Sequence, residues 1–194
     1  MKNKTNKEII VFLDVDGVIA TNNSIDNLWK EYMGEAPDNK FEKILNKKNL
    51  PFINTSMSHW PFDRNCISNI HKFQLELHEQ GHIVNYVISS TWKSMGTIEE
   101  LKDLFNMKGL YLTKIIGKTS RVKMSEQVRS DSPRGKEILQ WLKDNNKEDS
   151  TFIVIDDDID YDIIQYIEEK HCIKTEFKDG FTDGKRNELL NKLK

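Results

Sequence analysis

Cysteine is scarce in this chain, and no apolar run is long enough to span a membrane. The 194 residues contain two cysteines, Cys66 and Cys172, which are too few and too far apart in sequence to predict a disulfide framework or a zinc site. No stretch approaches the roughly 20 consecutive apolar residues of a transmembrane helix, and residues 1–7 are polar and basic, unlike a signal peptide. The formal net charge of −2 argues against a general electrostatic attraction to nucleic acid or membrane. We therefore expect a cytoplasmic, soluble protein without membrane contacts.

Internal repeats and low-complexity linkers are also missing, and residues 1–194 are expected to form a single domain around one core. Five segments rich in apolar and β-branched residues are predicted strands: residues 9–13, 82–88, 110–116, 151–155 and 172–177. Predicted helices begin at Asp63, at the capping box Thr97–Glu100, at Ser132-Pro133 and at Asp160, and a terminal helix carries Leu189. This alternation predicts an α/β fold, a three-layer Rossmann-like parallel sheet with helices on both faces.

The first predicted strand ends in two carboxylates and a glycine, Asp14-Val15-Asp16-Gly17. Residues i and i+2 of a strand point to the same side, so Asp14 and Asp16 can converge just past its end. Two such acids repel each other unless a cation or a proton lies between them. Ser89-Ser90-Thr91 and Asp156-Asp157-Asp158 follow two other strands, and ligands bind at this edge of parallel sheets. Oxygen ligands of this kind suit Mg²⁺; the alternative is that the second acidic cluster only caps the following helix.

Three further features have both a structural and a functional interpretation. Residues 20–61 form either a packing excursion on the domain surface or a small cap beside the site. Residues 118–136 contain six Lys or Arg against two acids, which is either a solvated face or a contact surface for a nucleic-acid backbone. Trp29, Trp60 and Trp92 are either base-stacking groups or packing residues.

The residues at the predicted strand ends fit phosphoryl transfer. A carboxylate can attack phosphorus to form an aspartyl-phosphate, and a second carboxylate two residues later can move the protons. The transferred group needs charge stabilisation. The Ser90 hydroxyl is a candidate donor, and Arg134 or Lys136, at the start of the predicted Ser132 helix, is a candidate cation.

The pattern resembles, in order along the chain, the four motifs of the haloacid dehalogenase (HAD) superfamily of phosphohydrolases. The matching residues are Asp14-Val15-Asp16-Gly17-Val18, Ser90, Arg134 or Lys136, and Asp156-Asp157. A narrower resemblance is to the small-cap HAD domains found with RNA-repair proteins, which are related to the phosphatase part of polynucleotide kinase-phosphatases. It rests on Ser89-Ser90-Thr91-Trp92, Arg134-Gly135-Lys136-Glu137-Ile138 with Trp141-Leu142, Ile155-Asp156-Asp157-Asp158 and Gly180-Phe181-Thr182. The resemblance implies a HAD-like fold with a minimal cap after the first strand.

The superfamily resemblance also implies a role for each acidic residue. Asp14 would be the nucleophile and Asp16 the general acid/base. Mg²⁺ would be held by Asp14, by the backbone carbonyl of Asp16 and by Asp157. Asp156 is the alternative ligand.

At the second and third motifs the resemblance leaves a choice of residue. Ser90 is preferred to Ser89 and Thr91 because of its spacing from the tryptophan that follows. Arg134 is preferred as the phosphate-binding cation, with Lys136 as the other candidate.

The expected function is a Mg²⁺-dependent phosphomonoester hydrolase that forms an aspartyl-phosphate. The segment after Gly17 is too short for a large cap, so the site is expected to admit bulky substrates such as nucleic-acid ends or nucleotides. A phosphatase of a small phosphometabolite is the alternative. A non-catalytic phosphate- or metal-binding module, such as a response-regulator receiver, is a third option, but a receiver would place its phosphoacceptor after the third strand, at Gly117-Lys118. A sugar-nucleotide transferase would not need Asp156-Asp157 after a second strand.

Overall fold

The computed structural model describes residues 7–24, 61–122 and 133–194. Most of the candidate cap (25–60) and the middle of the basic segment (123–132) lie outside the described residues, as do Trp29, Trp60 and Ser132. The cap, the single-domain organisation and the nucleic-acid contact surface therefore stay predictions.

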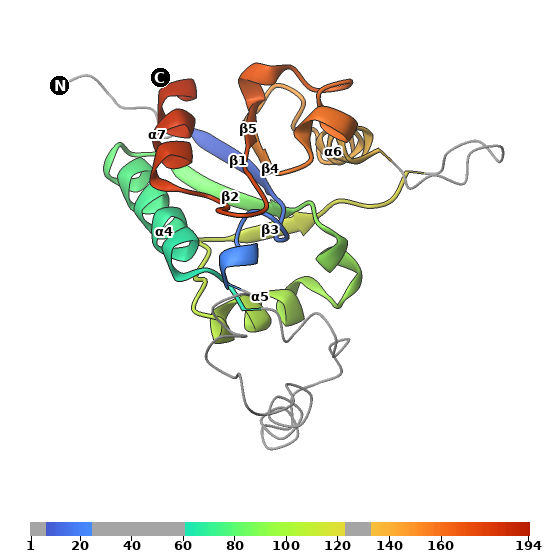
Figure 1. Ribbon diagram of the computed structural model, residues 1–194. Coiled ribbons are helices and arrows are strands. Elements are labelled where there is room, and N and C mark those ends of the chain that lie inside the picture. The colour runs from blue at the N-terminus through green and yellow to red at the C-terminus, as the bar shows by residue number, and fades with distance from the viewer. Residues whose placement is uncertain (1–6, 25–60, 123–132) are drawn as a thin grey trace, which may run out of the picture.

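The described strands form one all-parallel sheet in the order β3-β2-β1-β4-β5 (Figure 1). The strands are β1 (Glu8–Leu13), β2 (Ile83–Ile88), β3 (Ile115–Lys118), β4 (Thr151–Asp156) and β5 (Cys172–Lys174). The predicted α/β parallel sheet is confirmed. The central strand β1 is fully covered, because Ile9 through Leu13 are all buried, which is the arrangement expected of a strand with helices on both faces.

Helices cover both faces of the sheet. On one face the core includes side chains of α4 (Arg64–Glu79), α5 (Ile98–Met107) and α7 (Asp183–Lys192). On the other face it includes side chains of α6 (Arg134–Asp144) and of the π-helix η2 (Ile159–Ile163). Successive residues of β1 alternate between these two cores, as strand geometry requires. No helix in these described segments is long and apolar enough to cross a bilayer.

The third strand is shorter than predicted. The sequence favours residues 110–116, but pairing with β2 begins at Ile115. Before that point, side chains of α4 take over the backbone hydrogen bonds. The Gln74 amide accepts from the Thr113 N–H at 2.8 Å and donates to the Tyr111 carbonyl at 3.1 Å, and the His71 ring accepts from the Tyr111 N–H at 3.0 Å. An apolar run in the sequence does not reveal that side chains of α4 make these backbone hydrogen bonds in place of a neighbouring strand.

The segment after β4 also differs from its prediction, which was a regular helix over residues 160–170. It forms η2 and, later, the 3-10 helix η3 (Glu169–His171). The sequence predicts Ile163, Ile164 and Ile167 as the buried face of this helix. Ile163 and Ile167 are buried, as is Ile159, but Ile164 is 42% exposed. The start of α6 is also shifted slightly: Pro133 is the N-cap residue and Arg134 the first helical residue.

Candidate active site

A row of polar residues crosses the sheet where the strands end. Continued by one residue, the parallel register places Thr119, Ser89 and Asp14, just past β3, β2 and β1, beside one another and next to Asp156 at the end of β4. The sheet pairing continues into this row, since the Asp14 N–H donates to the Ile155 carbonyl at 3.0 Å and the Ser89 N–H to the Leu13 carbonyl at 2.9 Å. By strand alternation the row faces α6. The predicted convergence of three strand ends is therefore present at the carboxyl edge.

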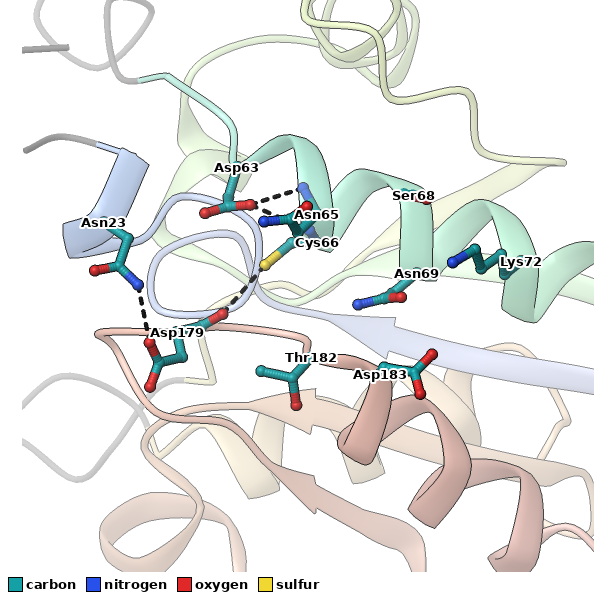
Figure 2. A pocket seen from close by; sticks show the side chains of 10 residues that line it. All are labelled: Asn23, Asp63, Asn65, Cys66, Ser68, Asn69, Lys72, Asp179, Thr182 and Asp183. Carbon is teal, nitrogen blue, oxygen red and sulfur yellow. Dashed lines mark hydrogen bonds between the residues drawn. The ribbon is translucent and has the colours of Figure 1, made fainter. Parts of the chain in front are cut away.

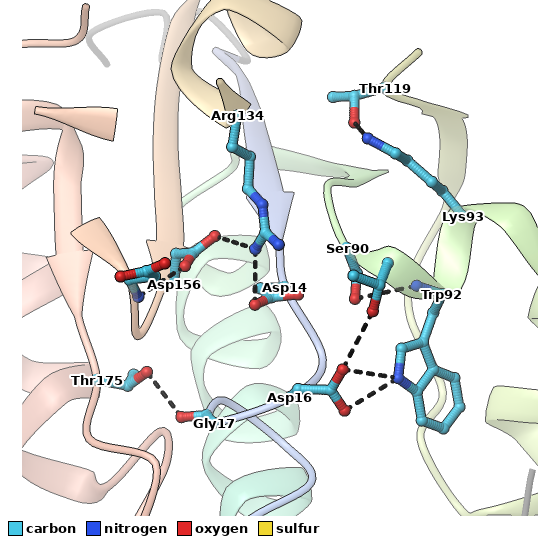
Figure 3. A network of polar contacts seen from close by, with 12 residues as sticks. Asp14, Asp16, Gly17, Ser90, Trp92, Lys93, Thr119, Arg134, Asp156 and Thr175 are labelled. Carbon is cyan, nitrogen blue, oxygen red and sulfur yellow. Dashed lines mark hydrogen bonds and ion pairs between the residues drawn. The ribbon is translucent and has the colours of Figure 1, made fainter. Parts of the chain in front are cut away.

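Arg134 joins the two acidic motifs. One guanidinium nitrogen, Nη1, lies 2.7 Å from Asp14 Oδ2 and 2.6 Å from Asp156 Oδ2 (Figure 3). Both carboxylates are buried, and the Arg134 side chain is 20% exposed. The first residue of α6 thus partly neutralises acids from β1 and β4.

The electrostatics of this cluster follow from burial and crowding. Burial, and then the charge of Asp14, raise the pKa of Asp156 to about 7 and that of Asp157 to about 6. Burial acts to lower the pKa of Arg134, but the charges of Asp14 and Asp156 outweigh it and raise this pKa. One oxygen of Asp14, Oδ1, is buried with no hydrogen-bond partner among the described residues. The cluster carries more negative charge than Arg134 balances, which favours a cation or a proton.

Asp157 lies directly over the backbone of Gly17. Gly17 has φ +69°, and a Cβ placed on it would lie 2.4 Å from Asp157 Cγ. The Gly17 carbonyl accepts from the buried Thr175 hydroxyl at 2.8 Å. Two constraints therefore require glycine here: the left-handed backbone and the approach of the Asp157 carboxylate.

Asp14 and Asp16 have different partners, although alternation along a strand would place them on one side. The Asp16 carboxylate accepts from Trp92 Nε1 at 3.0 and 3.2 Å (Figure 3). It also accepts from Thr91 Oγ1 at 3.3 Å. The chain turns at Gly17, next to the isolated bridge between Asp16 and Ala20. Burial raises the pKa of Asp16, against the hydrogen bond from Trp92. Trp92 is fully buried, so the base-stacking interpretation is wrong for this residue.

The hydroxyl groups after β2 also differ from one another. Ser90 is the N-cap residue of the 3-10 helix η1 (Thr91–Ser94), and its Oγ accepts from the Trp92 N–H at 3.4 Å. Ser89 lies beside Asp14 in the polar row, and its Oγ is buried without a hydrogen-bond partner among the described residues. The predicted Ser90 therefore caps a helix, while the neighbouring serine is next to Asp14.

The two candidate cations lie in different surroundings. Arg134 contacts the acids, as described above. Lys136 Nζ lies 5.2 Å from the centroid of the Tyr166 ring, a cation–π contact. The contact of Arg134 with Asp14 supports the preference for Arg134.

Sequence reasoning missed a buried ion pair at the same edge of the sheet. Lys93, from η1, pairs with Glu137, from the first turn of α6, and Lys93 Nζ also donates to Thr119 Oγ1 at 3.2 Å. The Thr119 hydroxyl donates to Glu137 Oε2 at 3.2 Å. The sequence feature that could have indicated this ion pair is Glu137, an acidic residue among the apolar positions on the buried face of α6.

Three carboxylates are placed to hold a metal ion. Oxygen atoms of Asp14, Asp156 and Asp157 all lie within 4.8 Å of one another. Carboxylate oxygens are the ligands that Mg²⁺ prefers in proteins, and the unpartnered Asp14 Oδ1 provides a further acceptor. The residues present fit a magnesium site.

A polar cavity of about 470 Å³ lies elsewhere, between α4 and the loop before α7 (Figure 2). The carboxylates that line it form hydrogen bonds or ion pairs with other residues of the protein. Asp63 caps α4, Asp179 accepts from Asn23 at 2.8 Å, and Asp183 pairs with Arg186 at 2.8 Å. None of the predicted site residues lines it. We therefore place the candidate active site at the polar row rather than in this cavity.

A parallel sheet with acids after its central strand and after the neighbouring strand, joined by a helix-borne arginine, has the features predicted for a HAD-type domain. The family model described as the HAD domain in Swiss Army Knife RNA repair proteins matches residues 10–185, and the chain belongs to this family. The predicted family is thus confirmed, and it indicates an enzyme of the phosphatase or hydrolase type. No curated protein matches the chain.

Proposed function

We propose that the protein is a Mg²⁺-dependent phosphomonoester hydrolase that works through an aspartyl-phosphate on Asp14. The observation that carries the proposal is the Asp14–Arg134–Asp156 cluster at the carboxyl edge of the sheet. Asp14 presents a buried carboxylate oxygen without a partner among the described residues. A carboxylate oxygen of Asp14 would attack phosphorus.

In the first step an Asp14 oxygen forms a bond to phosphorus, and the bond from phosphorus to the substrate oxygen breaks. Asp16 gives its proton to that leaving oxygen. The hydrogen bonds from Trp92 and Thr91 orient its carboxyl group. In the second step Asp16 takes a proton from water, the water oxygen attacks phosphorus, and Asp14 is released with inorganic phosphate.

Charge on the phosphoryl oxygens is stabilised by Arg134 and by a serine hydroxyl. The register and the unpartnered Oγ favour Ser89 for this contact over Ser90, because Ser89 is the neighbour of Asp14 in the polar row. Lys136 is the remaining candidate cation, and its contact with Tyr166 makes it the weaker one.

Asp14, Asp156, Asp157 and the backbone carbonyl of Asp16 would hold Mg²⁺. When bound, the ion would supply positive charge that offsets the charge of the phosphoryl group. The grouping of the three carboxylates supports this assignment.

For the substrate we propose a phosphorylated nucleic-acid end or a nucleotide. The family description, which places such domains in RNA repair proteins, supports this substrate class. The two free, buried cysteines are compatible with a reducing cytoplasm as the site of action. Comparison of kcat/KM on a 3′-phosphorylated oligonucleotide with a panel of mononucleotides and small sugar phosphates tests the substrate. A preference for the small sugar phosphates would contradict the proposal.

The mechanism is tested by replacing Asp14 with Asn. We expect Asp14→Asn to fold normally, by circular dichroism, and to lose hydrolysis of 4-nitrophenyl phosphate, because the amide cannot attack phosphorus. Asp160→Asn, an exposed acid paired with Lys174 at 2.5 Å, is the matched control and should retain wild-type activity. Equal activity in Asp14→Asn and wild type would rule out the aspartyl-phosphate.

A further inference from the structure

The partly buried Lys93–Glu137 pair links two elements of the proposed site, η1 and α6. Lys93 directly follows Trp92, whose indole holds Asp16 at 3.0 Å. Glu137 lies one helical turn after Arg134, which contacts Asp14 and Asp156. The ion pair therefore connects the segment that holds the proton-transfer residue with the helix that carries the phosphate-binding cation.

The start of α6 depends on such contacts for its position. Its N-cap residue, Pro133, makes no side-chain capping hydrogen bond. On one side Gly135 packs against η2 so closely that an added Cβ would lie 3.0 Å from the Ile163 carbonyl oxygen. On the other side Glu137 binds Lys93 and the Thr119 hydroxyl. These contacts fix the first turn of the helix, and hence Arg134, relative to the sheet.

Stability alone does not account for charged groups at this place. The Lys93 and Glu137 side chains are 14% and 4% exposed, and apolar residues of similar volume often stabilise a fold as well as a buried ion pair does. Buried polar networks do, however, restrict a fold to one geometry. A role in fixing the relative positions of η1 and α6 therefore explains this charged pair better than a gain in folding stability does.

We propose that Lys93 and Glu137 are positioning residues, which together set the placement of Arg134 and of Asp16 on either side of Asp14. This inference rests on the proposed function of the site. Neither residue contacts the reacting atoms. Their loss should therefore lower kcat rather than weaken substrate binding.

The test replaces the network by apolar residues of similar shape, in the triple variant Lys93→Met, Thr119→Val and Glu137→Leu. This design avoids leaving a buried charge or hydroxyl unpaired. With 4-nitrophenyl phosphate as substrate, we expect kcat to fall at least about tenfold and KM to change less than about twofold, because small displacements of catalytic groups have large effects on rate. Glu137→Gln removes the charge but keeps an acceptor for Thr119. This variant should also have a lower kcat and a nearly unchanged KM.

The matched control removes the ion pair between Glu8 and Lys147, which closes at 2.6 Å near the other end of α6. The double variant Glu8→Gln and Lys147→Met should retain the wild-type kcat. A folded triple variant or a folded Glu137→Gln variant with the wild-type kcat would overturn the proposal. So would a fall in kcat in the control as large as that in the triple variant.

Nuclear magnetic resonance gives a readout that does not depend on activity. The indole N–H signal of Trp92 and the guanidinium Nε–H signal of Arg134 should both shift in Glu137→Gln and in the triple variant. If either signal keeps its wild-type position in a folded variant, the proposal is wrong. If the wild-type protein hydrolyses no phosphomonoester but both signals shift, the proposed function fails while the positional coupling stands.

Discussion

Replacement of Gly17 by alanine tests whether the approach of Asp157 to the site loop matters for function. The new Cβ would lie 2.4 Å from Asp157 Cγ and 2.5 Å from its Oδ2, whereas ordinary contacts begin near 3.4 Å. The Asp157 carboxylate must therefore move by about 1 Å. Because Mg²⁺ tolerates little deviation from its preferred geometry, we expect its affinity to fall at least about tenfold.

Gly109→Ala is the matched control. Gly109 has φ +84°, similar to the +69° of Gly17, but nothing lies within 4 Å of its added Cβ. Both variants carry the cost of a left-handed alanine, about 1–2 kcal/mol, which corresponds to a melting temperature lower by roughly 2–8 °C in a chain of this size. Only Gly17→Ala should carry the additional cost of displacing Asp157.

The assay is a Mg²⁺ titration of the melting temperature and of 4-nitrophenyl phosphate hydrolysis for wild type and both variants. Gly109→Ala should have the wild-type half-saturating Mg²⁺ concentration, and Gly17→Ala a higher one. Equal values for all three proteins would refute the placement of Asp157 in the metal site.

Two further predictions concern the serines after β2 and the pH dependence of stability. Ser89→Ala should lower kcat on the order of 100-fold, because it removes a donor to the phosphoryl group. Ser90→Ala should keep its kcat and lose about 1 kcal/mol of stability, because it removes a helix cap. The reverse result in steady-state kinetics would favour Ser90. Without added metal, the wild-type melting temperature relative to that of Asp156→Asn should fall as the pH rises from about 4 to about 7 and then level off. The pKa of Asp156 is raised from 3.8 to about 7 in the folded chain, so its contribution to stability is fully present below the lower value and is lost by the time the pH has passed the higher one. A constant difference across this range would contradict the argument.

The edge of the sheet at which the site lies was predictable from the sequence, because it depends on local pattern. Apolar runs followed by Asp14, Ser89 and Asp156 mark strand ends, and parallel strands bring their carboxyl ends to one edge. The assignment of α6 to the face above Asp14 could not be read in the same way. It depends on packing between Arg134, Glu137 and residues distant in sequence.

What the sequence did not predict depends on tertiary contacts. The prediction extended the third strand back to Leu110 because its run is apolar, but Gln74 of α4 occupies the backbone groups of Tyr111 and Thr113. The preference for Ser90 followed from spacing and stays a prediction; that Ser89 is the neighbour of Asp14 depends on the register with β1. Strand register is a property of the assembled sheet, and a single strand does not encode it.

The central place of β1 in the sheet has a consequence for the order of synthesis. Leu13 pairs with Ile88 of β2 on one side and with Ile155 of β4 on the other. The second side of β1 therefore has no strand to pair with until β4 has left the ribosome. During that interval the apolar strand has an open edge, which is a template for pairing with other chains. The acidic cluster cannot assemble until Asp156 has been added. A chain released early therefore carries Asp14 without the neighbouring acid and without β4, the second partner of β1.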